Sequence, residues 1–225
     1  LVGGPHTRRQ GVVARGRLRE ALGAAGHPEA RVDLEEERDE SGGVVLVATL
    51  TTGPRVTISG VRIEGNAKTR TRRIESSLSL EVGEAWSLAK ERESFLDLYQ
   101  SGLFSSVGLA LEGEGSERTL VVNVVELPST ELYVEPGYGS YERLRLGVGW
   151  RENNLFGTGR VLDVTGTVSE LARRGQVDLT DRRLLGSDVQ GNLSVFTNTR
   201  EEPSFTSREL GTGVTFSRSF TERVR

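Results

Sequence analysis

The residues that most often carry catalysis or bind metals are sparse in this sequence of 225 residues. Its two histidines, His6 and His27, fall in or near expected turns and are not spaced as a pair of metal ligands. There is no cysteine, which excludes disulfides and cysteine metal sites. A surface histidine without a chemical role is the more common case, so we expect no metal, no cofactor and no enzyme activity.

Glycine-rich and charged segments add no cofactor site. Gly157-Thr158-Gly159 is not followed by the Gly-Lys-Ser/Thr of a phosphate-binding loop. The acidic run at residues 35–37 and the arginines between residues 8 and 19 most often indicate solvated faces, although the arginines could also contact lipid head groups or a partner. Acidic and basic residues are interspersed and the net charge is −3, so nucleic acid is not an expected partner.

The main chain offers a different chemistry. An exposed sheet edge presents unpaired N–H and C=O groups, and an extended polypeptide can add to that edge as a further strand. Such pairing depends little on side-chain identity, so it leaves no catalytic motif in a sequence. The strands that present an edge, and the elements that hold them, therefore decide what this chain can bind.

Two segments of the sequence repeat at a fixed distance. Residues 11–25 are predicted to form a helix that ends at Gly26, before strands at residues 29–37 and 44–50. A second predicted helix ends at Gly102, 76 positions later, before strands at residues 107–111 and 120–125. Its apolar stripe consists of Leu88, Phe95, Leu96 and Tyr99. A constant offset of this kind indicates a tandem array.

The second copy of the repeat is a complete module. Residues 56–64 form its first predicted strand, and the chain then turns at Gly65-Asn66. Thr69 is predicted to cap a first helix that carries Ile74 and Leu78 on one face. The order of elements is β-α-α-β-β, with two helices over a three-stranded sheet.

Two residues of the module are better explained by structure than by chemistry: Gly102 is expected to serve backbone geometry at a helix end, and Phe104 to anchor the core. The first copy lacks the opening strand and helix. Because the sequence also lacks Met, we expect an internal or processed segment that begins inside a module.

Beyond Pro128 the sequence alternates between apolar and polar residues in five successive segments. Their apolar faces consist of Leu144, Leu146, Val148 and Trp150; Leu162, Val164 and Val168; Val177 and Leu179; Val189, Leu193 and Val195; and Leu210, Val214 and Phe216. With the segment from Glu131, about six strands are expected. The pattern fits a membrane barrel with a lipid-facing band, or a soluble sandwich with one solvated face per sheet. We favour the barrel, which would need more strands than these because the smallest have about eight.

The module and the segment after it resemble the BamA-type outer-membrane assembly proteins, which carry periplasmic POTRA modules before a 16-stranded barrel. In the module the resemblance rests on Val61, Ile63, Glu64-Gly65-Asn66, Thr69, Ile74, Gly83, Leu96, Tyr99, Gly102-Leu103-Phe104, Val107, Val122, Val124 and Glu126. In the next segment, residues 133–140 resemble a first barrel strand, residues 153–159 a first periplasmic hairpin and residues 184–186 a second. The TamA branch of the family fits the same residues, and the motif that would separate the branches would lie beyond Arg225.

The resemblance implies an α+β fold of POTRA modules (β-α-α-β-β) followed by the N-terminal strands of an antiparallel transmembrane β-barrel. The expected domains are the C-terminal part of a POTRA module at residues 1–53, a complete POTRA module at residues 54–127 and the first barrel strands at residues 128–225. The barrel would lie in the bacterial outer membrane and the POTRA modules in the periplasm. The turn at residues 152–159 would face the periplasm, and loops at residues 169–175 and 197–207 would face outside.

The resemblance further implies an assembly factor that binds unfolded β-barrel clients by strand addition and helps to fold and insert them. Its expected partners are unfolded outer-membrane proteins, periplasmic accessory lipoproteins and outer-membrane lipid. The client edge of the module would contain Phe104, Ser105, Val107, Leu109 and Leu111, with residues 30–37 as the edge of the partial copy. The barrel seam strand would contain Leu132, Tyr133, Val134, Pro136, Gly137 and Tyr138. Pro136 and the glycines of this strand would weaken pairing at a seam that must open.

Other functions stay open at this point. A secretion pore of the two-partner type also joins POTRA modules to a barrel, but conducts a substrate through it. A TamA-like translocation and assembly protein would have the same architecture. A soluble interaction protein would follow if the strands formed a sandwich.

Overall fold

The structure, a computed structural model, describes residues 8–38, 44–187 and 189–218, and His6 lies outside these ranges. The chain divides into two compact units. The first comprises residues 1–65, 77–100 and 106–124, and the second comprises residues 66–76, 101–105 and 125–225. Each unit is therefore assembled from segments that lie far apart in the sequence.

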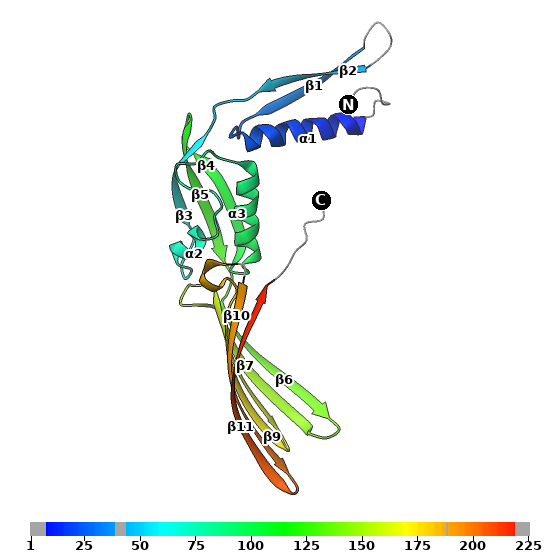
Figure 1. Cartoon of the computed structure of the whole chain (residues 1–225), viewed down its shortest axis with the longest axis vertical. Helices are drawn as coiled ribbons and strands as arrows, with labels where there is room; N and C mark the ends of the chain where they lie inside the picture. Colours follow the sequence, from blue (N-terminus) through cyan, green and yellow to red (C-terminus); the bar gives the residue numbers. More distant parts are fainter. Residues whose placement is uncertain (1–7, 39–43, 188, 219–225) are drawn as a thin grey trace. The chain divides into compact units, whose positions relative to one another are not determined.

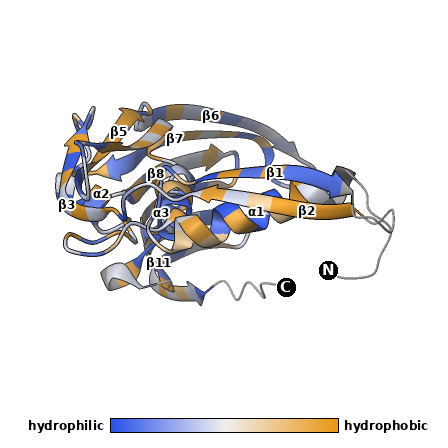
Figure 2. Cartoon of the chain, turned by 90° about the horizontal axis from the view of Figure 1, so that it is seen from above, coloured by the Kyte–Doolittle hydropathy of each residue, from blue (hydrophilic) through white to orange (hydrophobic). Residues whose placement is uncertain are grey.

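The first part of the chain forms a helix and two strands, as the repeat predicts. α1 spans Arg8–Ala24, β1 spans Arg31–Arg38 and β2 spans Val44–Thr51 (Figure 1). β1 and β2 pair antiparallel in unbroken register, and the hydropathy colours show β1 as largely polar and β2 as largely apolar (Figure 2). After α1, Gly26 adopts a φ of 97°, a left-handed conformation that glycine takes without strain.

The complete module contains a three-stranded sheet in the order β3-β5-β4. β3 spans Thr57–Glu64, β4 spans Phe104–Glu112 and β5 spans Glu117–Glu126, and β3 runs parallel to β5. Phe104 is 3% exposed and Gly102 has a φ of 72°, so both structural predictions for these residues are confirmed. The turn after β3 requires a glycine, because a Cβ on Gly65 would lie 2.0 Å from the Val124 carbonyl oxygen.

The first helix of the module is shorter than predicted. α2 spans Thr71–Glu75, and no side chain caps its N-terminus. The prediction that Thr69 caps this helix is wrong, because its hydroxyl accepts a hydrogen bond from Asn154 Nδ2 at 2.9 Å. Leu78 lies beyond the end of the helix. Ser76 donates its hydroxyl to the carbonyl three residues earlier, a local bond of the kind that competes with helix continuation.

The second helix of the module buries a different face from the predicted one. α3 spans Leu88–Gln100, and its buried side chains are those of Ser94 and Leu98. Ser94 is small enough for a neighbouring segment to approach, and its hydroxyl accepts the Ser79 N–H at 2.8 Å. Phe95 and Tyr99, from the predicted apolar stripe, are exposed and stack with their ring centroids 5.9 Å apart.

The second unit contains one antiparallel sheet of six strands, the number predicted, in the order β11-β10-β9-β8-β7-β6. The strands are β6 (Thr130–Gly139), β7 (Arg143–Leu155), β8 (Arg160–Ser169), β9 (Ala172–Asp181), β10 (Val189–Glu202) and β11 (Phe205–Arg218), and the 3₁₀ helix η1 (Leu184–Gly186) precedes β10. The connections after β8 and β10 are shorter than the loops predicted at residues 169–175 and 197–207. The strands continue into those segments and pair there.

One face of this sheet is apolar and exposed. Leu146, Val148, Val168 and Val214 are each more than half exposed, at 52–62%. In a soluble sandwich this face would be packed against a second sheet. Among the described residues these side chains remain uncovered, so the predicted alternation is confirmed and the face has the character of a lipid-facing band.

Candidate strand-pairing edges and their anchors

The residues predicted as the client edge all lie on β4, an outer strand of the three-stranded sheet. Phe104 is buried, so its side chain fixes the strand to the core and takes no part in an exposed surface. Ser105 is exposed, whereas Val107, Leu109 and Leu111 are half-buried. What β4 offers to another polypeptide is therefore mainly its main chain. The equivalent residues 30–37 lie mostly on β1, in a sheet of two strands.

The residues predicted as the barrel seam all lie on β6, an outer strand of the six-stranded sheet. β6 pairs with β7 in unbroken register from Thr130↔Glu152 to Gly139↔Arg143 and with no other described strand. The side chains of Leu132 and Tyr138 are 81% and 80% exposed. One side of β6 is thus anchored by β7, and its other side is a free edge among the described residues.

Pro136 reveals which main-chain groups of β6 face this free edge. In an antiparallel ladder, residues that exchange both hydrogen bonds with the partner strand alternate with residues whose main-chain groups point away. Pro136 pairs with Leu146 without a break in register, and proline has no N–H, so its nitrogen must point away from β7. The same alternation places the main-chain groups of Leu132, Val134, Pro136 and Tyr138 on the free edge. The predicted weakening by Pro136 therefore applies to that edge and leaves the ladder with β7 intact.

Tyr133 fastens β6 to the next two strands. Its ring lies against Gly149 of β7, where a Cβ would be 2.1 Å from a ring carbon. Its hydroxyl donates to Asp163 Oδ1 of β8 at 2.8 Å and lies 3.2 Å from Thr165 Oγ1. The Arg151 guanidinium lies 5.4 Å from the ring centroid and is paired with Asp163 at 2.5 Å. We call Tyr133, Gly149, Arg151, Asp163 and Thr165 the tyrosine clamp.

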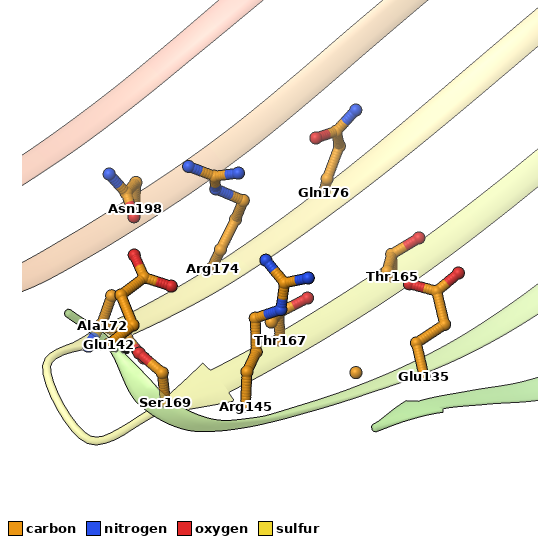
Figure 3. Close-up of a pocket in the computed structure, with 11 residues that line it drawn as sticks. Glu135, Glu142, Arg145, Thr165, Thr167, Ser169, Ala172, Arg174, Gln176 and Asn198 are labelled. Carbon is orange, nitrogen blue, oxygen red and sulfur yellow. Dashed lines mark hydrogen bonds between the residues drawn. The ribbon is translucent and has the colours of Figure 1, made fainter. Parts of the chain in front are cut away.

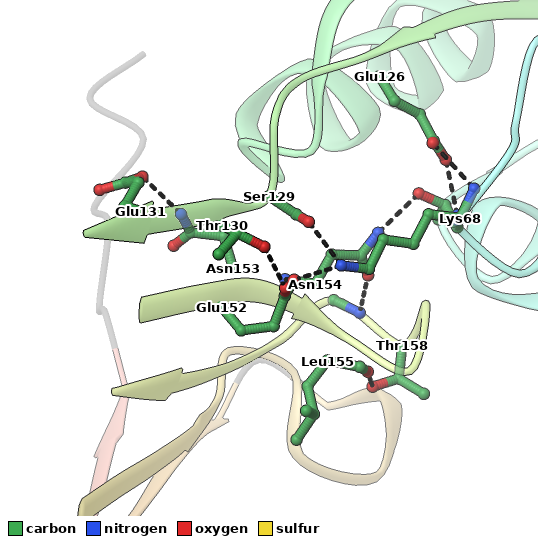
Figure 4. Close-up of polar contacts among 12 residues, drawn as sticks. Lys68, Glu126, Ser129, Thr130, Glu131, Glu152, Asn153, Asn154, Leu155 and Thr158 are labelled. Atoms are coloured by element: carbon green, nitrogen blue, oxygen red, sulfur yellow. Dashed lines mark hydrogen bonds and ion pairs between the residues drawn. The ribbon is translucent and has the colours of Figure 1, made fainter. Parts of the chain in front are cut away.

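A buried carboxylate at the end of β7 is the centre of a polar cluster (Figure 4). Glu152 is 6% exposed and pairs with Lys68 Nζ at 2.8 Å. It also accepts hydrogen bonds from Thr130 Oγ1 at 2.8 Å and from the Asn154 N–H at 2.9 Å. Lys68 Nζ donates in addition to Ser129 Oγ at 2.6 Å. A carboxylate this buried needs several partners, because an unpaired buried charge is strongly destabilising.

Glu126, the last residue of β5, extends the cluster to the loop before α2. Its carboxylate accepts the N–H groups of Lys68 at 2.9 Å and Thr69 at 2.6 Å. Partial burial acts to raise the pKa of Glu126, but the hydrogen bonds from Thr69 and Lys68 outweigh burial and hold this pKa below the ordinary value of 4.5. We call Lys68, Thr69, Glu126, Glu152 and Asn154 the polar junction.

The turn after β7 accepts this loop because residue 157 is a glycine. Gly157 has a φ of 71°, and a Cβ there would lie 2.1 Å from the Lys68 carbonyl oxygen. The Gly157 carbonyl accepts the Arg70 N–H at 2.9 Å, and Asn154 Oδ1 accepts the Gly159 N–H at 2.8 Å. The Gly-Thr-Gly segment is thus a docking turn for residues 66–76.

Side chains on the polar face of the six-stranded sheet line a cavity of about 320 Å³ (Figure 3). Charges of both signs line it, including Arg145, Arg174, Glu135 and Glu142, together with Gln176 and several hydroxyl groups. These side chains project from the face opposite the apolar one. Polar and charged side chains are typical of a hydrated barrel interior.

Sequence reasoning did not find the polar junction or the tyrosine clamp. Both are formed by residues from separate segments, and no local period connects them. One indication was present in the sequence: Glu152 and Asn154 continue the alternate positions of Leu146, Val148 and Trp150, so polar side chains replace apolar ones on the same face. A buried contact at the strand end explains that change.

Two features are absent from the described residues. No group of three or more histidine, cysteine, aspartate or glutamate side chains within residues 8–38, 44–187 and 189–218 could hold a metal ion. None of the helices in the same ranges combines the length and the apolar character needed to cross a membrane.

Two family models match the chain. The POTRA model, described as a surface antigen variable number repeat, matches residues 56–127. The Omp85 superfamily domain matches residues 154–225. The first match covers the module with the β-α-α-β-β order, and the second covers the sheet from the end of β7 onwards.

Curated relatives and a solved structure agree with these matches. The outer membrane protein assembly factors BamA of Neorickettsia risticii (strain Illinois) and Neisseria meningitidis serogroup B (strain ATCC BAA-335 / MC58) are 26% and 24% identical over 186 and 198 residues, which are 82% and 83% of this chain. The chain spans about a quarter of either relative's length, 25% in both cases.

The fold is also that of a solved BamA. The crystal structure of BamA from Haemophilus ducreyi lacking POTRA domains 1–3 has a TM-score of 0.85 at 17% identity, covering 96% of this chain and 42% of that one. CdiB from Acinetobacter baumannii is less similar, with a TM-score of 0.53 at 11% identity over 96% of this chain and 43% of that one. The α+β fold of a POTRA module followed by barrel strands is thus confirmed. In sequence and fold the chain is therefore similar to the BamA-type proteins of the Omp85 superfamily, and its location is the outer membrane with its POTRA modules in the periplasm.

Proposed function

We propose that this chain is part of an assembly factor that binds unfolded outer-membrane β-barrel proteins by strand addition and helps to fold and insert them. The free edge of β6 carries the proposal. Its main-chain groups at Leu132, Val134 and Tyr138 have no partner strand among the described residues, while β7 and the tyrosine clamp fix its other side. The names of the two curated relatives, both outer membrane protein assembly factors, support the same function.

The physical driving force is the pairing of main-chain groups. An unpaired N–H or C=O in hydrocarbon costs several kcal/mol, so an unfolded client cannot enter the bilayer strand by strand without a partner. β6 would supply hydrogen bonds to the client's first inserted strand, largely independent of its side chains. The exposed apolar face around Leu146 and Val148 would contact outer-membrane lipid at the same site. No catalytic step is required, so the proposed protein is not an enzyme.

The periplasmic part of the proposal concerns β4 and accessory proteins. We propose that β4 receives extended client segments before they reach the membrane, because it is an outer strand whose residues Val107, Leu109 and Leu111 are only half-buried. Periplasmic accessory lipoproteins are the further proposed partners, on the strength of the family alone.

Site-specific photocrosslinking of the full-length protein in vesicles tests the main proposal. A photoreactive residue at Leu132 or Val134 on β6 should capture the terminal strand of an unfolded β-barrel client. A photoreactive residue at Val164, on the same face but on the interior strand β8, should not. Equal capture at all three positions would show non-specific contact along the apolar face and contradict strand addition at β6.

A secretion pore of the two-partner type is the second candidate, and the looser structural likeness to CdiB gives it less support. Conductance and transport in planar bilayers distinguish the two functions. Translocation of a cognate secreted protein, with no effect of the purified protein on porin assembly, would favour the pore. Porin assembly without such translocation would favour the assembly factor, including a TamA-like one.

A further inference from the structure

The free edge of β6 contains a single missing donor near its middle. Leu132, Val134 and Tyr138 each present both an N–H and a C=O to an added strand, but Pro136 presents only its C=O. An antiparallel strand that pairs with this edge therefore has one carbonyl, on the residue opposite Pro136, that finds no donor. The missing donor divides the edge into a segment before Pro136, with Leu132 and Val134, and a segment after it, with Tyr138.

We propose that Pro136 limits how long a client strand stays paired with β6, whatever the side chains of that client. We call Pro136 the release point. This inference rests on the proposed function and names one residue that sets the lifetime of the paired state. A free edge with a donor at every position would hold the client by one more main-chain hydrogen bond. One unsatisfied carbonyl weakens the client ladder at its middle without changing any side-chain contact.

The missing donor weakens only the pairing with the client, because the other contacts of β6 hold it to β7 and β8. Pro136 continues the ladder with β7 in register, because its nitrogen points away from β7. Earlier in the strand, Tyr133 donates a hydrogen bond to Asp163, and Thr130 donates one to Glu152. These contacts lie on the anchored side of the strand. Loosening a client therefore does not loosen β6 itself.

Two substitutions with opposite expected effects test the inference. Pro136→Ala restores the missing donor, and Val134→Pro removes a second donor from the same edge. Both residues face the free edge, so neither substitution removes a hydrogen bond from the β6–β7 ladder. Glu135→Pro is the control, because the Glu135 N–H faces β7. Hydrogen exchange of β7 amides should be unchanged in the first two variants and faster in the third.

The lifetime of the engaged client is the decisive measurement. The full-length protein in vesicles is loaded with a β-barrel client and chased, and the fraction captured by a photoreactive residue at Leu132 is followed over time. One net hydrogen bond corresponds to roughly a 2- to 10-fold change. We expect the client to stay longer by that factor in Pro136→Ala and shorter in Val134→Pro.

The outcomes separate this inference from the proposed function. Capture of the client with equal lifetimes in all folded variants would overturn the release point and leave the assembly function standing. Shorter client engagement in Pro136→Ala would show that the missing donor does not promote release, which also overturns the proposal. Absence of capture at β6 in every variant, including the unsubstituted protein, would overturn the proposed function and this inference with it.

Discussion

A few polar side chains in this chain hold strands in place. They do so through ion pairs and through hydrogen bonds to buried carboxylates. Tyr133 is held by Asp163, and Asp163 is in turn paired with Arg151. Glu152 and Lys68 form a similar pair at the end of β7. Each carboxylate is largely buried and has several donors, which is the condition under which a buried charge is tolerated. Removing one partner should therefore affect the neighbouring strand more than the loss of an exposed ion pair would.

The hydroxyl of Tyr133 should stabilise the attachment of β6. Tyr133→Phe keeps the ring against Gly149 but removes the hydrogen bond to Asp163. We expect the local opening of β6 to become easier by about 1 kcal/mol, which is roughly fivefold faster amide exchange at β6. Tyr138→Phe is the matched control on the same strand, since its side chain is 80% exposed on the apolar face. Equal exchange in both variants would show that the clamp contributes nothing.

Glu126 should make stability depend on pH in the acidic range. Its pKa is lowered in the folded chain, so protons bind more strongly to the unfolded chain. The stabilisation is therefore complete above the ordinary value of 4.5 and is lost as the pH falls through the folded-state pKa. In Glu126→Gln this contribution is absent, so unfolding midpoints of the two proteins should differ at about pH 7 and converge at about pH 3. Glu114→Gln, in the exposed turn after β4, is the matched control for the loss of one carboxylate.

At the scale of elements, the sequence predicted what local periodicity controls. The order helix-strand-strand, its recurrence and the six alternating strands follow from apolar spacing and glycine positions, and all are present. The errors arise where a distant contact overrides a local preference. Thr69 was expected to cap α2, but its hydroxyl accepts a hydrogen bond from Asn154, which lies far along the chain. In α3 the core receives Leu98 and Ser94, because the segment at Ser79 packs against the small serine.

The polar junction could not be predicted for the same reason. Its residues lie on β5, on the loop before α2 and at the end of β7, and only the folded chain brings them together. The free edges were predictable as strands, but the side of β6 on which Pro136 lacks a donor required the observed register. A sequence shows that proline is present in a strand; the pairing shows which neighbour loses the hydrogen bond.

The docking turn provides a test of how elements are joined. Gly157→Ala places a Cβ close to the Lys68 carbonyl, whereas Gly186→Ala, at a φ of 81°, meets open space. Both substitutions carry a similar backbone strain of about 1 kcal/mol. Gly157→Ala should cost roughly 1–3 kcal/mol more, because the loop must move off the turn. Urea unfolding and protease cleavage near Lys68 would measure this, and equal effects of the two substitutions would contradict the docking role.

For the whole molecule, the question is which solvent each face of the six-stranded sheet meets. The apolar face is exposed along several strands, and the opposite face is charged and surrounds a polar cavity. If both faces met water, the sheet would expose a large apolar patch, which soluble proteins rarely do. A bilayer on one side and water on the other satisfies both faces, and it agrees with the location of the family.

Introducing the same charge on the two faces tests this arrangement directly. Val148→Arg adds a cation to the apolar face of β7 at a side chain that is 54% exposed, and Gln176→Arg adds one to the polar face beside Asp178. In water alone both positions would accept arginine at little cost, because neither side chain is in the core. If the apolar face meets lipid, Val148→Arg should destabilise the full-length protein in vesicles by roughly 2–4 kcal/mol, and Gln176→Arg should stay near the unsubstituted protein. Urea unfolding followed by heat-modifiable gel mobility measures the difference. Equal stability of the two variants would mean that this face does not lie in hydrocarbon, and the strand-pairing site on β6 would then have to operate in water.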